Sequence, residues 1–297
     1  MVAGGKDAAS CRGAACSFRE DISDDERPAS FRRTRDLLEE LYLEFNRREY
    51  VSPDPLEFLY MYDSPADREV VGLIASSLAY GRVASILASV RRVLDVLGKN
   101  PADALARSDF SSLFSRLEGF KHRFNGSEEM CRFLSGIGEA LRRYGSLENV
   151  FRSAKESSIL GAMDNFADTI LRLGGLGSSH LLPRASKGSA CKRLALFIRW
   201  MARCDDVDPG GWKGVAPCDI IVPLDTHMFR IATGLGFVKR RSADGTAAEE
   251  ATDGFRAFCP ADPVKYDFAL TRFGIRTEMS VGELLEKFDQ SRKEPTQ

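Results

Sequence analysis

The stretch that decides the fold of this chain reads Pro223-Leu224-Asp225-Thr226-His227-Met228-Phe229-Arg230-Ile231, with Leu235-Gly236 shortly after it. An apolar run, Ile220 to Val222, leads into this stretch, and the Asp225 carboxylate can accept hydrogen bonds from the first backbone amides of a helix. Leu235-Gly236 is a typical helix end. We therefore predict a helix that begins after Asp225 and ends near Gly236, with a carboxylate at its entrance. On local chemistry alone, an ordinary helix cap explains the same residues.

Composition describes an ordinary globular chain. The 297 residues are 43% hydrophobic and 9% aromatic, enough for one large domain or two lobes with a sizeable core. No apolar run approaches the length that crosses a bilayer, and the first residues lack the apolar core of a secretory signal. We expect a cytoplasmic protein that does not associate with a membrane.

Cysteine and histidine usage gives no metal motif. The seven cysteines are scattered at wide intervals, which argues against a disulfide framework and favours a reducing compartment. The three histidines lie too far apart for a local metal motif, although a pairing between distant segments stays open. We expect no metal site.

Charge is the main objection to a nucleic-acid partner, because 42 basic and 43 acidic side chains give a net charge of −1. One stretch answers the objection in part. Between positions 184 and 203 the chain has no acidic residue and six basic ones, namely Arg184, Lys187, Lys192, Arg193, Arg199 and Arg203. Phosphate contact requires a local positive face and not a positive total, and this stretch could supply one.

The spacing of apolar residues predicts an all-α protein. An apolar helix over Val70 to Ala79 breaks at Tyr80-Gly81-Arg82, and a second helix follows from Val83 to about Leu97. Residues 1–28 have the composition of a disordered tail, and residues 291–297 should fray. Further helices are predicted over 31–49, 128–144, 159–173, 194–201, 246–258 and 262–274, with a short helix ending at Tyr60.

The segment around Asp225 resembles the catalytic-aspartate segment of the helix-hairpin-helix DNA glycosylase superfamily, of which endonuclease III is the best-known member. Asp225, Thr226, His227, Arg230, Ile231, Leu235 and Gly236 carry the match. The whole chain is more similar to a bacterial protein family to which no activity is assigned. That similarity rests on Lys192-Arg193-Leu194 and on the runs 197–201, 223–227 and 262–274.

The resemblance to the glycosylases implies a two-lobed helical fold with a cleft between the lobes. One lobe would span about 67–203 and the other about 31–62 plus 217–290, within one domain over 29–290. Gly188 and Lys192 match the spacing of the hairpin glycine and the catalytic lysine of the superfamily. The pattern departs from the superfamily in two places, because a second hairpin glycine is missing and because residues 204–218 form an insert. Three aspartates of the insert (Asp205, Asp206 and Asp208) lack the closing glutamate of a calcium loop, and we interpret them as a solvated turn.

The catalytic roles that the resemblance implies fall on two residues. Asp225 would stabilise the positive charge that develops on a sugar as its base departs, and the helix amides favour its ionised form. Lys192 would attack the same carbon as a neutral amine, in a lyase step that burial and the adjacent Arg193 favour. A lysine that faces phosphate or water remains the alternative interpretation for Lys192.

The implied contacts to DNA fall on two segments. Tyr80, Gly81 and Arg82 would form the loop that fills the gap left by an extruded base, and a plain turn at Gly81 is the alternative. The second segment would contribute Arg184, Lys187, Gly188, Arg193 and Arg199. The extruded base needs an aromatic pocket wall, for which Trp200, Trp212, Tyr266 and Phe268 are available.

The function implied by the resemblance is a DNA base-excision glycosylase acting on double-stranded DNA, with a lyase step open. We expect no cofactor and no iron-sulfur cluster, because no cysteine follows Cys259. Two alternatives stay open, and with them the question of whether the chain is an enzyme. One is a non-catalytic nucleic-acid-binding module of the same fold, and the other is a helical interaction protein.

Overall fold

The computed structural model describes residues 27–153 and 158–293 and shows an all-α protein. In these residues the β-structure is limited to a two-stranded antiparallel hairpin and an isolated bridge between Cys204 and Pro209. The predicted tail over 1–28 lies almost entirely outside the described residues, as do positions 294–297. Within the described ranges, no helix combines the length and apolar character needed to cross a membrane.

The elements follow one another along the chain in three groups. The first group is α1 (Ala29–Phe45), η3 (Arg48–Tyr50), η4 (Pro55–Met61), α2 (Pro65–Ser77) and α3 (Val83–Leu97). The second is α4 (Pro101–Arg107), α5 (Phe110–Arg116), β1 (Lys121–His122), β2 (Asn125–Gly126), α6 (Ser127–Tyr144), α7 (Leu147–Ser153) and α8 (Ile159–Leu173). The third is η5 (Ala185–Lys187), α9 (Lys192–Ala202), η6 (Pro217–Asp219), α10 (Thr226–Gly234), α11 (Gly245–Arg256), α12 (Asp267–Ile275) and α13 (Val281–Lys293).

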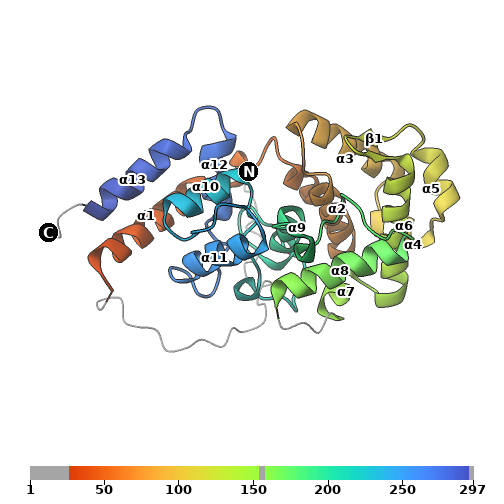
Figure 1. The fold of residues 1–297 in the computed structure, drawn as a ribbon. Coiled ribbons are helices and arrows are strands. Elements are labelled where there is room, and N and C mark those ends of the chain that lie inside the picture. The colour runs from red at the N-terminus through yellow and green to blue at the C-terminus, as the bar shows by residue number, and fades with distance from the viewer. Residues whose placement is uncertain (1–26, 154–157, 294–297) are drawn as a thin grey trace.

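The two ends of the described chain lie together. Helix α1 packs along α13 and α12, and α10 packs against α12 and α13. In Figure 1 these helices occupy one side of the molecule, whereas α3 to α8 occupy the other. Helix α9 lies between the two groups and packs against α2. It therefore connects the two sides of the molecule.

Helix α2 forms the centre of the core. Ser64 caps it by accepting from the Asp67 amide, Pro65 begins it, and nearly every residue from Asp67 onward is buried. The helix ends before Gly81, whose φ of +104° is a conformation that a β-carbon disfavours. Helix α3 then begins at Val83, as predicted, and the break at Tyr80-Gly81-Arg82 is confirmed.

Several other predicted helices are confirmed to within a residue or two. Helices α6 and α8 occupy the predicted ranges 128–144 and 159–173, and they lie so close that a β-carbon at Gly136 or Gly174 would overlap the backbone of the other helix. Helix α12 begins at Asp267 and not at 262, because residues 259–266 form turns first. Helix α13 continues through Lys293, past the predicted start of fraying.

Two predictions about polar segments are wrong. The insert 204–218 is not a solvated turn, because Asp208 is fully buried and Trp212 nearly so. The basic stretch 184–203 does not form one positive face, because Arg193, Arg199 and Arg203 are buried. Arg199 pairs with Asp208 and Asp267, and Arg203 pairs with Asp205, Asp208 and Asp262. Asp205 and Asp208 of the insert, together with Asp262 and Asp267, thus neutralise the buried Arg199 and Arg203.

The cysteines also differ from expectation. Cys131, Cys191 and Cys259 are free thiols, whereas Cys204 and Cys218 are disulfide-bonded.

Candidate functional site

Asp225 lies at the entrance of α10, as predicted, and its two carboxylate oxygens face different partners. Oδ1 accepts hydrogen bonds from the amides of His227 (2.9 Å) and Met228 (2.8 Å), which confirms the cap. Oδ2 lies 3.4 Å from the Nζ of Lys192. The cap therefore fixes the orientation of the carboxylate and leaves one oxygen directed at the amine.

Lys192 is the first residue of α9, and a tightly bonded loop positions it. Gly188 (φ +83°) and Cys191 (φ +49°) both adopt the left-handed conformation. The Asp164 carboxylate on α8 accepts from the amides of Ala185 and Ser186. The buried Cys191 thiol donates to the Pro183 carbonyl (3.2 Å), and burial raises the pKa of this thiol to about 11. The lysine side chain thus leaves a loop that is anchored at several points.

Both residues line a pocket of about 620 Å³. Its wall comes from segments that are distant in sequence, namely positions 53–56, 79–86, 180–200, 223–227 and 267–275. The side chains of the pair are partly accessible, with 36% of Lys192 and 13% of Asp225 exposed. The pair is therefore neither sealed in the core nor directed away from the cavity.

Two of the four candidate aromatic residues line this pocket, namely Trp200 and Phe268. The other two do not line it and are tied to carboxylates elsewhere. The Trp212 indole donates to Glu69 (2.9 Å), and the Tyr266 hydroxyl donates to Glu39 (2.6 Å). The sequence alone did not rank these four residues.

Two further carboxylates, Asp54 and Asp267, also line the pocket, and neither was predicted from the sequence. Asp267 is the more deeply buried of the two. One of its oxygens pairs with Arg199, and the other has no partner among the described residues. Burial raises the pKa of Asp267 to about 6; the Arg199 charge opposes this shift, and the Asp225 charge adds to it. The pocket therefore contains three carboxylates in different environments: Asp225 caps α10, Asp54 caps η4, and Asp267 is buried.

Arg193 and Tyr80 brace the pocket from the side of α2. The Arg193 guanidinium donates to the carbonyls of Ser77 (2.8 Å) and His180, and it lies 4.6 Å from the centroid of the Tyr80 ring. The Tyr80 hydroxyl in turn bonds to Asn125 and to the His122 carbonyl. These contacts hold Tyr80 in place at the pocket wall, while Gly81 and Arg82 beside it are exposed.

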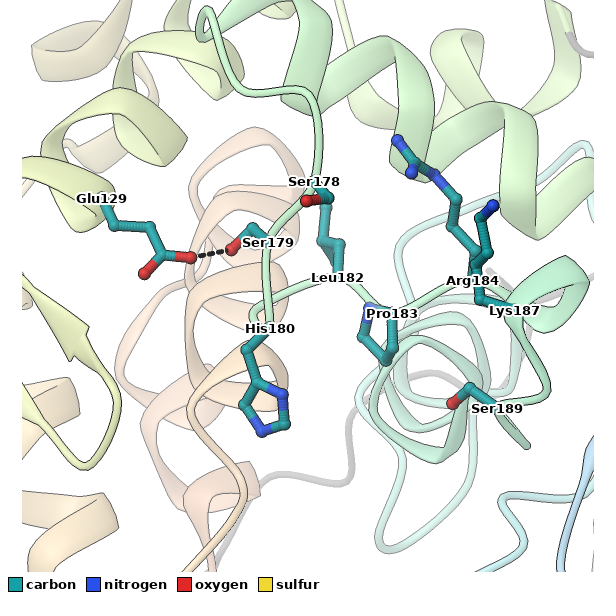
Figure 2. A pocket seen from close by; sticks show the side chains of 9 residues that line it. All are labelled: Glu129, Ser178, Ser179, His180, Leu182, Pro183, Arg184, Lys187 and Ser189. Carbon is teal, nitrogen blue, oxygen red and sulfur yellow. Dashed lines mark hydrogen bonds between the residues drawn. The ribbon is translucent and has the colours of Figure 1, made fainter.

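The remaining predicted DNA contacts lie beside a second pocket of about 520 Å³, drawn in Figure 2. Arg184 pairs with Asp168, whereas Lys187 and Gly188 are exposed. The second pocket shares His180, Pro183 and Ser189 with the larger one, so the two are neighbours. Figure 2 also shows that the Ser179 hydroxyl donates a hydrogen bond to the Glu129 carboxylate, on the side of this second pocket away from Arg184. The predicted contacts thus divide into accessible residues (Gly81, Arg82, Lys187 and Gly188), partly buried ones (Tyr80 and Arg184) and buried ones (Arg193 and Arg199).

In the described ranges 27–153 and 158–293, no group of three or more His, Cys, Asp or Glu side chains is arranged to hold a metal ion.

Together these features define an all-α protein in which a carboxylate and an amine meet at a large pocket. Residues 54–276, which contain both members of the pair, match the model of a family described as a protein of unknown function (DUF2400). The chain belongs to that family. No curated protein and no solved structure matches it.

Proposed function

We propose that this protein is a DNA base-excision glycosylase that acts on an extruded nucleotide, with a lyase step available to Lys192. The observation that carries the proposal is the 3.4 Å approach of the Lys192 amine to the Asp225 carboxylate at the wall of a deep pocket. The resemblance of the segment around Asp225 to the catalytic segment of the helix-hairpin-helix glycosylases supports it. The hairpin of that fold would correspond to residues 185–192, with Gly188 as its remaining glycine.

The proposed chemistry uses the two side chains at one carbon of the sugar. As the glycosidic bond breaks, its electrons leave with the base, and positive charge develops at the anomeric carbon. The ionised Asp225 stabilises that charge, and water then adds to the carbon and loses a proton to complete hydrolysis. In the lyase route, the Lys192 amine adds to the carbon in place of water and loses a proton, and the C–O bond of the sugar ring then breaks as the ring oxygen takes up a proton and an imine forms. Loss of a proton from the adjacent carbon then expels the 3′-phosphate by β-elimination, which cleaves the strand.

The volume of the pocket supports the proposal. Its volume falls in the range of about 300–1,000 Å³ typical of small-molecule sites. Asp225 and Lys192 supply charge at this cavity, while Trp200 and Phe268 lie buried in its wall, only 1% and 2% exposed, so a flipped base would need them to become more accessible.

The test is incubation of the full chain with labelled duplexes, each carrying one damaged base, in the presence and absence of borohydride. Release of a base by the wild-type protein, with a loss of about 100-fold or more in Asp225→Asn, is the result expected for the hydrolase. A borohydride-trapped adduct that disappears in Lys192→Ala identifies the lyase route. Lys287→Ala is the control, because this exposed lysine on α13 lies outside the pair and lines neither pocket.

A non-catalytic nucleic-acid-binding module of the same fold is a second candidate, favoured by one observation. The loop before Lys192 has a single glycine where two would let the backbone approach phosphate closely, and Arg193 and Arg199 are buried. Binding of duplexes without release of any base, unchanged in Asp225→Asn, would favour the module over the enzyme.

A further inference from the structure

The hairpin formed by β1 and β2 presents the most exposed large apolar side chain of the described residues. Phe124, at the tip of the hairpin, is 73% exposed. Its ring contacts the His180 ring edge-on (5.6 Å between centroids) and lies 5.5 Å from the Arg123 guanidinium. Arg123 itself adopts a left-handed conformation (φ +51°), which turns the chain at the tip. A single exposed ring is common on protein surfaces, so it indicates a partner only together with the charged residues that lie on the same elements.

Exposed cations lie on the hairpin and on the helix that packs against it. Arg82, Arg92, Lys121 and Arg123 are all exposed, and none of them has an ion pair with a carboxylate in the part of the chain that the structure describes. They come from α3 with its cap and from the hairpin, and α3 packs against β1. We call these four residues and Phe124 the hairpin surface.

Two internal contacts hold the cations in place. Arg92 donates to the Glu118 carbonyl (2.6 Å), which uses one of its N–H groups and leaves its charge without a counterion. The Arg123 side chain lies over Gly81, where an added β-carbon would come within 3.0 Å of the Arg123 Cδ. The hairpin therefore rests directly on the loop between α2 and α3.

The hairpin surface reaches the edge of the larger pocket. Gly81, beneath Arg123, lines that pocket, and so does His180, which contacts Phe124. A strand that placed one nucleotide in the pocket would thus pass over cations and an exposed ring on the neighbouring surface. A basic face was predicted over 184–203, and the exposed cations lie instead on α3 and the hairpin, which nothing in the sequence placed side by side.

We propose that the hairpin surface binds a DNA strand beside the pocket, with its cations at the phosphates and Phe124 stacked on an unpaired base. The inference rests on the proposed function for its choice of DNA. The partner is anionic because four cations lack carboxylates, and it carries planar rings because an exposed phenyl group favours stacking. Stacking of this kind tolerates any base, so the surface contributes affinity for an opened duplex and not for a sequence.

The experiment measures binding of the full chain by fluorescence anisotropy to two labelled duplexes. One duplex is fully paired, and the other contains a single tetrahydrofuran analogue of an abasic site, which cannot form an imine and leaves the opposite base unpaired. Phe124→Ala should weaken binding to the abasic duplex by about tenfold and leave binding to the paired duplex nearly unchanged. Lys121→Ala should weaken binding to both duplexes and lower the slope of log K against log salt by about 1.

Helices α1 and α13, which Figure 1 shows on the side of the molecule away from β1, supply two control variants. Leu43→Ala on α1 removes a similarly exposed apolar side chain, and Lys287→Ala on α13 removes an exposed cation. Neither should change binding. If Phe124→Ala and Lys121→Ala bind both duplexes as the wild type does, or if the wild type retains neither duplex at low salt, the assignment of the hairpin surface is overturned.

This outcome is separable from that of the proposed function, because binding is measured without cleavage. Loss of abasic-duplex preference in Phe124→Ala, together with no release of any base, would support the surface and contradict the glycosylase. Base release with unchanged binding in both hairpin variants would do the reverse.

Discussion

The Nζ of Lys192 lies 3.4 Å from the Oδ2 of Asp225, and the two residues begin two different helices, α9 and α10. Oδ1 of the same carboxylate accepts hydrogen bonds from the first amides of α10. The Asp225 side chain therefore caps the N-terminus of its helix and also faces the amine. Asp225 thus has two roles, the helix cap and the negative charge beside Lys192, and a mutation can remove one without the other.

Asp225→Asn should separate capping from charge. Asparagine caps helices about as well as aspartate, so the free energy of unfolding should change by a few tenths of a kcal/mol from the cap, whereas Asp225→Ala should lose about 1 kcal/mol. Urea unfolding monitored by circular dichroism measures both. Equal destabilisation by the two substitutions would show that the ion pair with Lys192, and not the cap, dominates the contribution of this residue.

Asp267 should make stability depend on pH in an uncommon direction. Its pKa is raised to about 6 by burial, so between about pH 4 and pH 6 the folded chain binds a proton here that the unfolded chain does not. Stability from this group therefore increases as pH falls through 6. Relative to Asp267→Asn, the wild type should gain up to about 3 kcal/mol in free energy of unfolding between pH 7 and pH 4.

The comparison with Asp267→Asn is informative because the pH dependence contributed by the other carboxylates is common to both proteins and cancels in the difference. Burial raises the pKa of Asp205, but the Arg203 charge outweighs this effect and the pKa is lowered. A hydrogen bond from Arg240 lowers the pKa of Asp244. Both carboxylates therefore lose stabilisation as pH falls, in the wild type and in the variant. Denaturant titrations of both proteins at several pH values provide the measurement. A difference that stays constant from pH 7 to pH 4 would contradict the raised pKa.

Arg193 should be a structural residue. It joins the end of α2, the loop at His180 and the Tyr80 ring, so Arg193→Ala should lower the free energy of unfolding by about 2–4 kcal/mol. Lys187→Ala, on the exposed part of the same segment, should stay within about 0.5 kcal/mol of the wild type. Urea unfolding of both variants decides the matter, and a near-neutral Arg193→Ala would reopen its assignment as a phosphate contact.

Gly274 should be required for the approach of α12 to α10. A β-carbon at this position would overlap the His227 side chain, two residues after Asp225, so Gly274→Ala should cost about 1–3 kcal/mol. Gly282→Ala is the matched control, because an added β-carbon at this α13 position meets only the Ser280 Oγ at 3.4 Å. The control should be neutral or stabilising by up to about 1 kcal/mol, since alanine favours a helix. Thermal unfolding of the two variants tests the contrast.

The sequence by itself determined the features that depend on neighbours along the chain. Apolar residues at helical spacing placed α3, α6 and α8 almost to the residue, and the chemistry of capping identified Asp225. These features follow from local geometry, in which a carboxylate bonds to amides two and three residues ahead. Short elements escaped this reasoning, because a strand of two residues, as in β1, has no period to detect.

Only the tertiary structure decided which charges face solvent and which meet one another. Arg199 and Arg203 have the sequence context of a basic surface, yet carboxylates from the insert and from α12 neutralise them in the core. The same packing brings Lys192 to Asp225, places Asp267 at the pocket and leaves the cations of the hairpin surface without carboxylates. The physical reason is that a buried charge requires compensation within a few ångströms, by carboxylates at Arg199 and Arg203 and by carbonyl groups at Arg193, and these partners can come from any part of the chain.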